Sequence, residues 1–200
     1  MGRIRGFAAV SALALAWGTA VAIPAEAAIL GCGDIVVRNT TLENDVGPCG
    51  VGLVIGADNI TLDLNGYSIT GLPRTDDGAG IYLLRRTNVT VKNGTVRNFD
   101  GGVVLDGGTQ NTVRNMDVHD NIGVVGQTRY AEGIALLSST NNRIIGNRVR
   151  HNGPLGGIGL YSRVDINHPR QTSGLTTGNL IDSNQVLDNN IERNAGLNDS

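Results

Sequence analysis

The chain has 200 residues, 40 % of them hydrophobic, and a formal net charge of −2, which allows a packed core and argues against disorder. Glycine occupies 29 positions without a three-residue period, which excludes a collagen, and the abundance of Gly and Asn disfavours helix bundles and coiled coils. A pI of about 5.9 argues against a basic nucleic-acid-binding module, so no nucleic-acid partner is expected. What remains is a fold of many short strands joined by tight turns.

The first 27 residues have the pattern of a secretory signal peptide. Arg3 and Arg5 give the positive start, the stretch 7–23 is apolar, and small residues precede the expected cleavage site at Ala28. A cut after Ala22 and an uncleaved membrane anchor are the alternatives. Because no second long apolar run follows, the mature protein is expected to be secreted, periplasmic or at the cell surface, without a membrane partner.

Cys32 and Cys49 are the only cysteines of the chain. In the oxidising compartment that a signal peptide implies, an isolated pair usually forms a disulfide. The alternative is a thiolate metal site, which would need two further ligands, and no histidine lies nearby in the sequence. We therefore expect the segment 28–50 to be an N-terminal cap held by this disulfide, whose loop closure is worth about 3 kcal/mol.

From residue 51 onward the chain is an imperfect repeat. Each unit has an apolar pair two positions apart, then a second and a third apolar position five residues apart, such as Val91 and Val96. Apolar residues two apart face one side of a strand, and the Asn or Gly of the following bend accepts the left-handed backbone of a sharp corner. A glycine opens each unit, and the units start at 52–55, 80–83, 102–105, 133–136 and 157–160.

This template predicts an all-β fold, a right-handed single-stranded parallel β-helix with about five rungs in residues 51–200. Stacked rungs would pair in parallel, with inward Ile, Leu and Val in a narrow column that leaves little room for aromatic rings. Asparagines at equivalent corners could form a hydrogen-bonded ladder. A β-sandwich would not repeat Asn at one fixed offset, and the leucine-rich-repeat pattern is absent. Because repeat-like lettering continues after Asn189, we expect the coil to be incomplete at its C-terminus.

Several stretches resemble secreted bacterial β-helix repeat proteins of the pectin-lyase-like superfamily. The stretches 32–34, 40–42, 49–50 and 60–71 resemble their entry region, and 133–152 is similar to their G-I-x-L and N-x-I-x-x-N-x-V-x-x-N repeat. The resemblance covers residues 30–194 and implies the β-helix fold. The superfamily includes pectate lyases, polygalacturonases, alginate epimerases and phage tailspikes, so the resemblance does not decide the activity.

Insertions interrupt the repeat and mark surfaces where solenoids carry function. Two of them, 72–79 and 122–132, fall at the corner between the third strand of one rung and the first strand of the next, and 162–178 falls at a different corner. In the enzymes that the chain resembles, loops at the first corner wall a sugar cleft beside the first-strand sheet. The insertions carry Arg74, Asp76, Asp77, Arg129, Tyr130, Glu132, Arg163, Asp165, His168 and Arg170.

Residues that flank the inward positions are expected to point outward. On the third strands, parallel pairing would place Arg97, His119 and Arg150 in one column at steps of about 4.8 Å. It would place Asp117 beside Arg148, and arginines can hold uronate carboxylates bidentately. The catalytic candidates are therefore Asp117, His119, Arg148 and Arg150. The substrate-binding candidates are Tyr82, Arg97, Asp106, Arg129, Tyr130 and Glu132.

A lyase or epimerase acting on uronates needs a cation that neutralises the acid and a base that removes the neighbouring proton. Asp117 or Asp106 could bind Ca²⁺, and His119, or an arginine as in pectate lyases, could act as the base. The alternative is an outer face of ordinary Arg–Asp and Arg–His contacts, each worth little.

Two hypotheses for the function follow. The protein acts on a uronate-containing glycan by β-elimination or epimerisation, or it is a non-catalytic binding or surface-display solenoid. An acidic polysaccharide is the expected partner, no cofactor beyond Ca²⁺ is implied, and the oligomeric state stays open.

Overall fold

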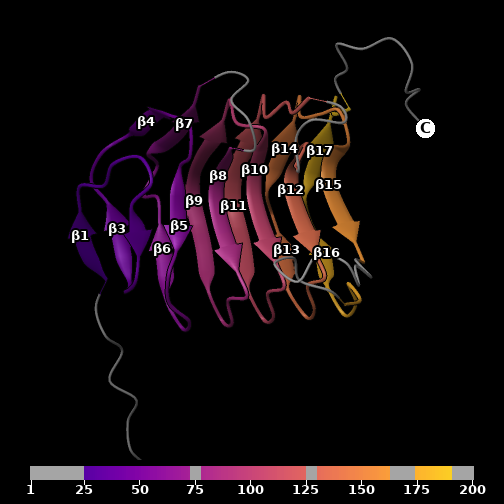
Figure 1. Cartoon of the computed structure of the whole chain (residues 1–200), viewed down its shortest axis with the longest axis horizontal. Helices are drawn as coiled ribbons and strands as arrows, with labels where there is room; N and C mark the ends of the chain where they lie inside the picture. Colours follow the sequence, from indigo (N-terminus) through magenta and orange to yellow (C-terminus); the bar gives the residue numbers. More distant parts are fainter. Residues whose placement is uncertain (1–24, 73–77, 125–129, 163–173, 191–200) are drawn as a thin grey trace, which may run out of the picture.

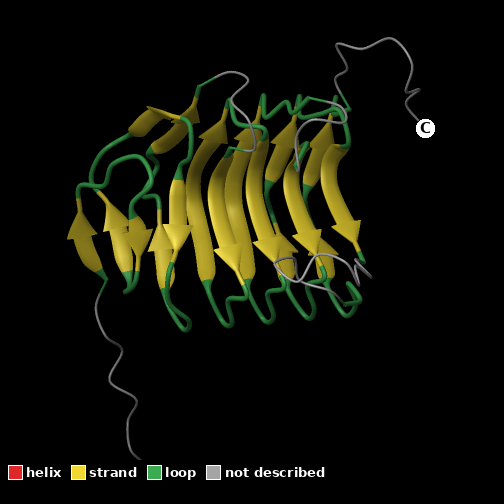
Figure 2. Ribbon diagram, viewed as in Figure 1, coloured by secondary structure: helices red, strands yellow, loops and turns green. Residues whose placement is uncertain are grey.

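The computed structural model describes residues 25–72, 78–124, 130–162 and 174–190, and throughout these ranges the regular structure is β-strand without helix (Figure 2). The strands stack side by side along the long axis of the molecule, from the N-terminal end to the C-terminal end (Figure 1). All described strand pairs are parallel. This confirms the predicted parallel β-helix.

The coil has two sheets. The six-stranded sheet contains the first strand of each turn, in the order β15-β12-β10-β8-β5-β2. Its strands are β2 (Ile35–Val36), β5 (Leu53–Ile55), β8 (Ala79–Leu84), β10 (Gly101–Asp106), β12 (Glu132–Leu137) and β15 (Gly156–Tyr161).

The eleven-stranded sheet contains the second and third strands. Its second strands are β1 (Glu26–Ala28), β3 (Thr40–Leu42), β6 (Thr61–Asp63), β13 (Arg143–Ile145) and β16 (Leu180–Asp182), and its third strands are β4 (Val46–Cys49), β7 (Ser68–Gly71), β14 (Arg148–Arg150) and β17 (Gln185–Leu187). In two turns the second and third strands are continuous, as β9 (Thr90–Arg97) and β11 (Thr112–His119). The strands β2, β3 and β4 form one further turn inside the segment 28–50, in which Gly33 is in register with the opening Gly52 but Asp34 occupies the first apolar position.

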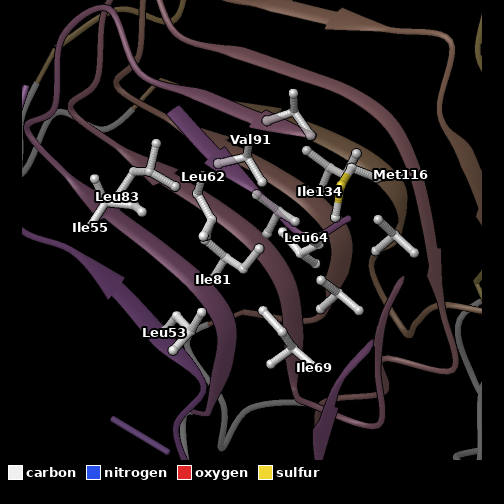
Figure 3. Packing of buried hydrophobic residues seen from close by; sticks show 14 of the residues in the cluster. Leu53, Ile55, Leu62, Leu64, Ile69, Ile81, Leu83, Val91, Met116 and Ile134 are labelled. Atoms are coloured by element: carbon white, nitrogen blue, oxygen red, sulfur yellow. The ribbon is translucent and has the colours of Figure 1, made fainter. Parts of the chain in front are cut away.

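The core is a column of aliphatic side chains enclosed by the coil (Figure 3). Leu53, Ile81 and Leu62, which come from different strands, are fully buried within it. One aromatic ring, that of Phe99, also lies in this column and is 1 % exposed. The ring has room because a Cβ at Gly71 would lie 2.8 Å from its Cδ1 atom and a Cβ at Gly80 would lie 3.0 Å from Cδ2.

Buried asparagines form the predicted ladder at the corners. The longest chains run from Asn111 through Asn142 to Asn179 and from Asn121 through Asn152 to Asn189. In each step the side-chain oxygen of the later residue accepts hydrogen bonds from the backbone nitrogen and the amide nitrogen of the earlier one. The ladder thus satisfies buried backbone groups that a tight corner leaves unpaired.

The asparagines of the bend between second and third strands have two different roles, which the sequence pattern does not distinguish: some adopt the left-handed corner conformation and others form the ladder. Asn93 and Asn115 take the left-handed conformation, with φ of 60° and 52°. In the next turn Gly146 takes that conformation, with φ of 63°, and the following Asn147 forms a buried ladder step with Asn184. A corner asparagine and a ladder asparagine therefore differ by one position in the bend.

The N-terminal end is held by the predicted disulfide, since Cys32 and Cys49 are bonded with 5.4 Å between their Cα atoms. A disulfide indicates a location outside the cytoplasm. In the described ranges, no helix of a length and apolarity suited to crossing a bilayer occurs. The cleavage site expected before Ala28 falls inside β1, whose Glu26 pairs with Thr40, while residues 1–24 lie outside the described residues.

Candidate functional site

The insertions occur at the predicted corners of the coil. The first two lie between β7 and β8 and between β11 and β12, and the third lies between β15 and β16. Several candidates within them lie outside the described residues: Arg74, Asp76, Asp77, Arg129, Arg163, Asp165, His168 and Arg170. Tyr130 and Glu132 are among the described residues. Glu132 is the first residue of β12 in the six-stranded sheet, and Tyr130 precedes it by two positions.

The outer side of the six-stranded sheet is apolar and aromatic. Parallel register stacks Val54, Tyr82, Val104, Ala135 and Gly159 in one outward column. Val104 and Ala135 are fully buried although they point away from the core, because a second hydrophobic cluster covers them. Three rings belong to or pack on this cluster, those of Tyr82, Tyr130 and Tyr161, which we name the tyrosine face.

Tyr82 and Tyr130 are joined at one end of the tyrosine face. Their ring centroids are 6.1 Å apart with planes tilted by 46°, a favourable arrangement for two aromatic rings. The Tyr82 hydroxyl donates a hydrogen bond to Asp106 Oδ2 at 3.2 Å. Burial first, then the hydrogen bond with Tyr130 and the negative charge of Asp106, raise the pKa of the Tyr82 phenol far above its usual value. The Tyr82 phenol is therefore a fixed, neutral donor.

At the other end of the tyrosine face, Tyr161 and Glu132 form a phenol–carboxylate pair like that of Tyr82 and Asp106. Glu132 opens β12 in register with Gly156 of β15, so its side chain has room along the outer face. The Tyr161 ring lies over Gly159, where a Cβ would be 2.5 Å from the ring and 3.0 Å from Glu132 Cγ. Burial and the neighbouring Glu132, which accepts a hydrogen bond from the phenol, raise the pKa of Tyr161 well above its usual value.

The two carboxylates support the rings from beneath. Asp106 and Glu132 are each 2 % exposed, and Glu132 Oε2 also accepts a hydrogen bond from the Ala131 nitrogen at 2.9 Å. Both had been selected from the sequence as groups that touch substrate. The structure places them under phenols, where they fix the orientation of Tyr82 and Tyr161.

The predicted basic column lies on the eleven-stranded sheet. Arg97, His119 and Arg150 are in register on β9, β11 and β14, and Asp117 is in register with Arg148. The ion pair of Asp117 is diagonal, with Arg150 Nη2 at 3.2 Å from Asp117 Oδ2. Arg97 thus belongs to a different sheet from Tyr82, with which it had been grouped as a substrate-binding residue.

His119 has a partner, Asp120, that is not among the predicted site residues. Its Nδ1 lies 2.7 Å from Asp120 Oδ2, and its side chain is 12 % exposed. His151 lies between two aspartates, 3.8 Å from Asp120 Oδ1 and 3.8 Å from Asp188 Oδ2. Asp120, His151 and Asp188 all have positive φ at the corner that follows the third strand. Each comes directly after the last residue of its third strand, and this shared position was the signal in the sequence that could have predicted their contacts.

Asp106 and Asp117, the two aspartates proposed as Ca²⁺ ligands, lie on different sheets. Within the four described ranges, three or more His, Cys, Asp or Glu side chains do not gather anywhere in a way that could hold a metal ion.

Comparison with known proteins agrees with this architecture. A search of curated proteins and a search of solved structures each gave no match. A family model described as a right-handed β-helix region matches residues 27–198, which is most of the chain. Together with the parallel register of both sheets, this match shows that the chain belongs to the family of right-handed β-helix proteins.

Proposed function

We propose that the protein binds a polysaccharide on the tyrosine face. The observation that carries the proposal is the pair of partly exposed, outward rings of Tyr82 and Tyr161 on one sheet, with the buried Tyr130 packed against Tyr82. Aromatic rings offer flat apolar surface to the faces of sugar rings, and phenols add a hydrogen-bonding tip. The two exposed rings come from β8 and β15, three strands apart, or about 14 Å at the usual strand spacing. That length suits several sugar units of a chain.

The tyrosine face is preorganised. The Tyr82 phenol is held by Asp106 and the Tyr161 phenol by Glu132, so little rotamer freedom remains to be lost when a ligand docks. Tyr82 and Tyr161 are partly exposed, whereas Tyr130, Val104 and Ala135 beside them are buried, so these two rings are the part of the tyrosine face that a ligand can touch. The same sheet continues to the exposed Ile35 of β2 and Leu84 of β8, which are 64 % and 37 % accessible.

The test uses a pair of variants at Tyr161. Tyr161→Ala removes the ring, and Tyr161→Phe keeps the ring but removes the hydroxyl. Calorimetric titration with polygalacturonate, alginate and a neutral glycan should show the largest loss of affinity for Tyr161→Ala and a smaller one for Tyr161→Phe. Circular dichroism and thermal unfolding would check that both variants fold. Equal affinities for the wild type and Tyr161→Ala on every glycan would refute the proposal.

A second candidate function is uronate elimination or epimerisation at His119. The observation in its favour is the 2.7 Å contact between His119 Nδ1 and Asp120, which leaves Nε2 as the nitrogen that could take a proton. Arg97 and Arg150 flank His119 in register and could hold carboxylates of the glycan.

This second function is tested by absorbance of the unsaturated product. Purified protein would be incubated with polygalacturonate or alginate, with and without added Ca²⁺, beside the His119→Ala variant. Product from the wild type alone would support elimination. Epimerisation would be followed by proton NMR of the uronate residues, and the absence of any change on both substrates would rule the catalytic function out.

A further inference from the structure

The outer side of the eleven-stranded sheet is strongly basic in its middle. The strands β9, β11, β13 and β14 carry six Lys or Arg residues and one carboxylate, Asp117, so their formal charge is +5. The whole chain has a net charge of −2, so the rest of the sequence carries −7. We call the six residues the basic band: Lys92, Arg97, Arg114, Arg143, Arg148 and Arg150.

The register brings like charges together in this band. Lys92 lies directly opposite Arg114, and Arg97 and Arg150 flank His119 on either side. Like charges that face each other across strands destabilise a sheet. At the N-terminal edge of the band, opposite charges meet instead, since Lys92 Nζ lies 2.9 Å from Asp63 Oδ2 of β6. The band therefore carries a repulsion that a bound anion would relieve.

Most of the band has no ion-pair partner among the residues that the structure describes. Lys92 pairs with Asp63 and Arg150 pairs with Asp117. Arg97, Arg143 and Arg148 are exposed and Arg114 is partly exposed, and these four have no carboxylate partner within the described ranges. Arg97 Nε donates a hydrogen bond to the Thr70 hydroxyl at 3.2 Å, and all four residues have surface that a ligand can reach from solvent.

We propose that the basic band binds an acidic polysaccharide through its carboxylate groups, on a surface separate from the tyrosine face. Planar guanidinium groups match carboxylates bidentately, and arginines supply five of the six cations. The disulfide indicates a compartment outside the cytoplasm, which favours a glycan over a nucleic acid as the polyanion. This site involves the second strands, whose Arg114 and Arg143 have no part in either function proposed above.

The experiment compares two double variants with the same loss of charge. Arg114→Gln with Arg143→Gln removes two charges from the band. Arg38→Gln with Arg85→Gln removes two exposed charges elsewhere, of which Arg38 forms an exposed ion pair with Glu26, and is the control for the loss of charge. Binding to polygalacturonate at low ionic strength is expected to weaken about tenfold in the band variant and little in the control. Added salt should narrow the difference because it screens exposed charges.

The ligand panel separates this proposal from the tyrosine face. The band variant should keep any affinity for a neutral glycan, whereas Tyr161→Ala should lose it. Equal weakening of polygalacturonate binding in both double variants would overturn the basic band as a site. Binding of duplex DNA as tight as that of polygalacturonate at the same ionic strength would overturn the assignment to a polysaccharide.

Discussion

The side-chain oxygen of Asn152 accepts hydrogen bonds from both the backbone nitrogen of Asn121, at 3.1 Å, and its amide nitrogen, at 2.9 Å. The two residues are 31 positions apart in the chain and both are fully buried. One side chain thus joins successive turns of the coil at a corner and supplies the acceptor for the backbone nitrogen of Asn121.

Removing this step should destabilise the fold. Asn152→Ala leaves the backbone nitrogen of Asn121 without its acceptor, while the Asn121 amide nitrogen keeps the carbonyls of Val96 and His119, and a buried unsatisfied donor costs about 1–3 kcal/mol. Denaturant unfolding should show a loss of this size. Thr90→Ala, on the outward side of β9, is the control and should change the free energy of unfolding much less. Similar losses in both variants would contradict a special role for the ladder.

The Cys32–Cys49 bond should stabilise the N-terminal turn. The cysteines are 17 positions apart, and closing a loop of this size in the unfolded chain corresponds to about 3 kcal/mol. The double variant Cys32→Ala with Cys49→Ala should lose roughly that amount in denaturant unfolding under oxidising conditions. With reductant present, the wild type should approach the stability of the double variant. Mass spectrometry without reductant would check the bond in the wild type.

Gly159→Ala should weaken glycan binding with little effect on folding. The added Cβ would lie 2.5 Å from the Tyr161 ring, which must move away from Glu132. Because the contact is with the end of a side chain, the ring can move at small cost in stability. We expect the affinity for glycans to fall toward that of Tyr161→Ala while the melting temperature changes little. Unchanged affinity would mean that the position of the ring does not matter for binding.

The buried phenols should make the protein sensitive to alkali. The pKa of Tyr82 is raised in the folded state above its ordinary value of 10, so above pH 10 the folded protein keeps a proton that the unfolded chain loses. Stability from this group is present below pH 10 and falls as the pH rises further. Tyr82→Phe should flatten that fall. Denaturant midpoints measured across this range, together with phenolate absorbance, would check it.

Asp63 should contribute to the loss of folding stability at acidic pH. Burial alone would raise its pKa, but hydrogen bonds from Lys92, the Asn65 backbone and Asn93 outweigh burial and hold the pKa below its usual value of 3.8. Its stabilisation is therefore present above pH 3.8 and is lost as the pH falls through the lowered pKa. Asp63→Asn should be less stable at neutral pH and should lose less stability on acidification. Identical acid unfolding of both proteins would contradict this assignment.

Much of the fold could be predicted because a β-helix repeats its constraints in each turn. The glycine and the apolar pair identify the first strand, and the five-residue step identifies the bend, so the column of Arg97, His119 and Arg150 followed from spacing. The turn formed by β2, β3 and β4 was hidden because Asp34 follows Gly33 where the other turns have their first apolar residue. Phe99 could not be placed inside, since its space comes from Gly71 and Gly80 of other positions in the coil.

The candidate site was predictable in part for the same reason. Tyr82 and Asp106 follow from strand alternation, whereas the contact of Tyr130 with Tyr82 depends on the path of an insertion that has no repeat. The pairing of Tyr161 with Glu132 needs the empty position at Gly159, which alternation alone does not reveal. His119 could be placed in its column, but its contact with Asp120 requires the turn of the backbone after β11.

The sequence by itself therefore determined the coil, its register and the disulfide-bearing end, because backbone pairing and burial impose a period that can be read in the residues. Only the tertiary structure decided that Asp106 and Glu132 lie beneath tyrosines and that Arg150 pairs diagonally with Asp117. Side-chain contacts between turns depend on the room that neighbouring residues leave, and that room is a property of the packed coil rather than of any one repeat.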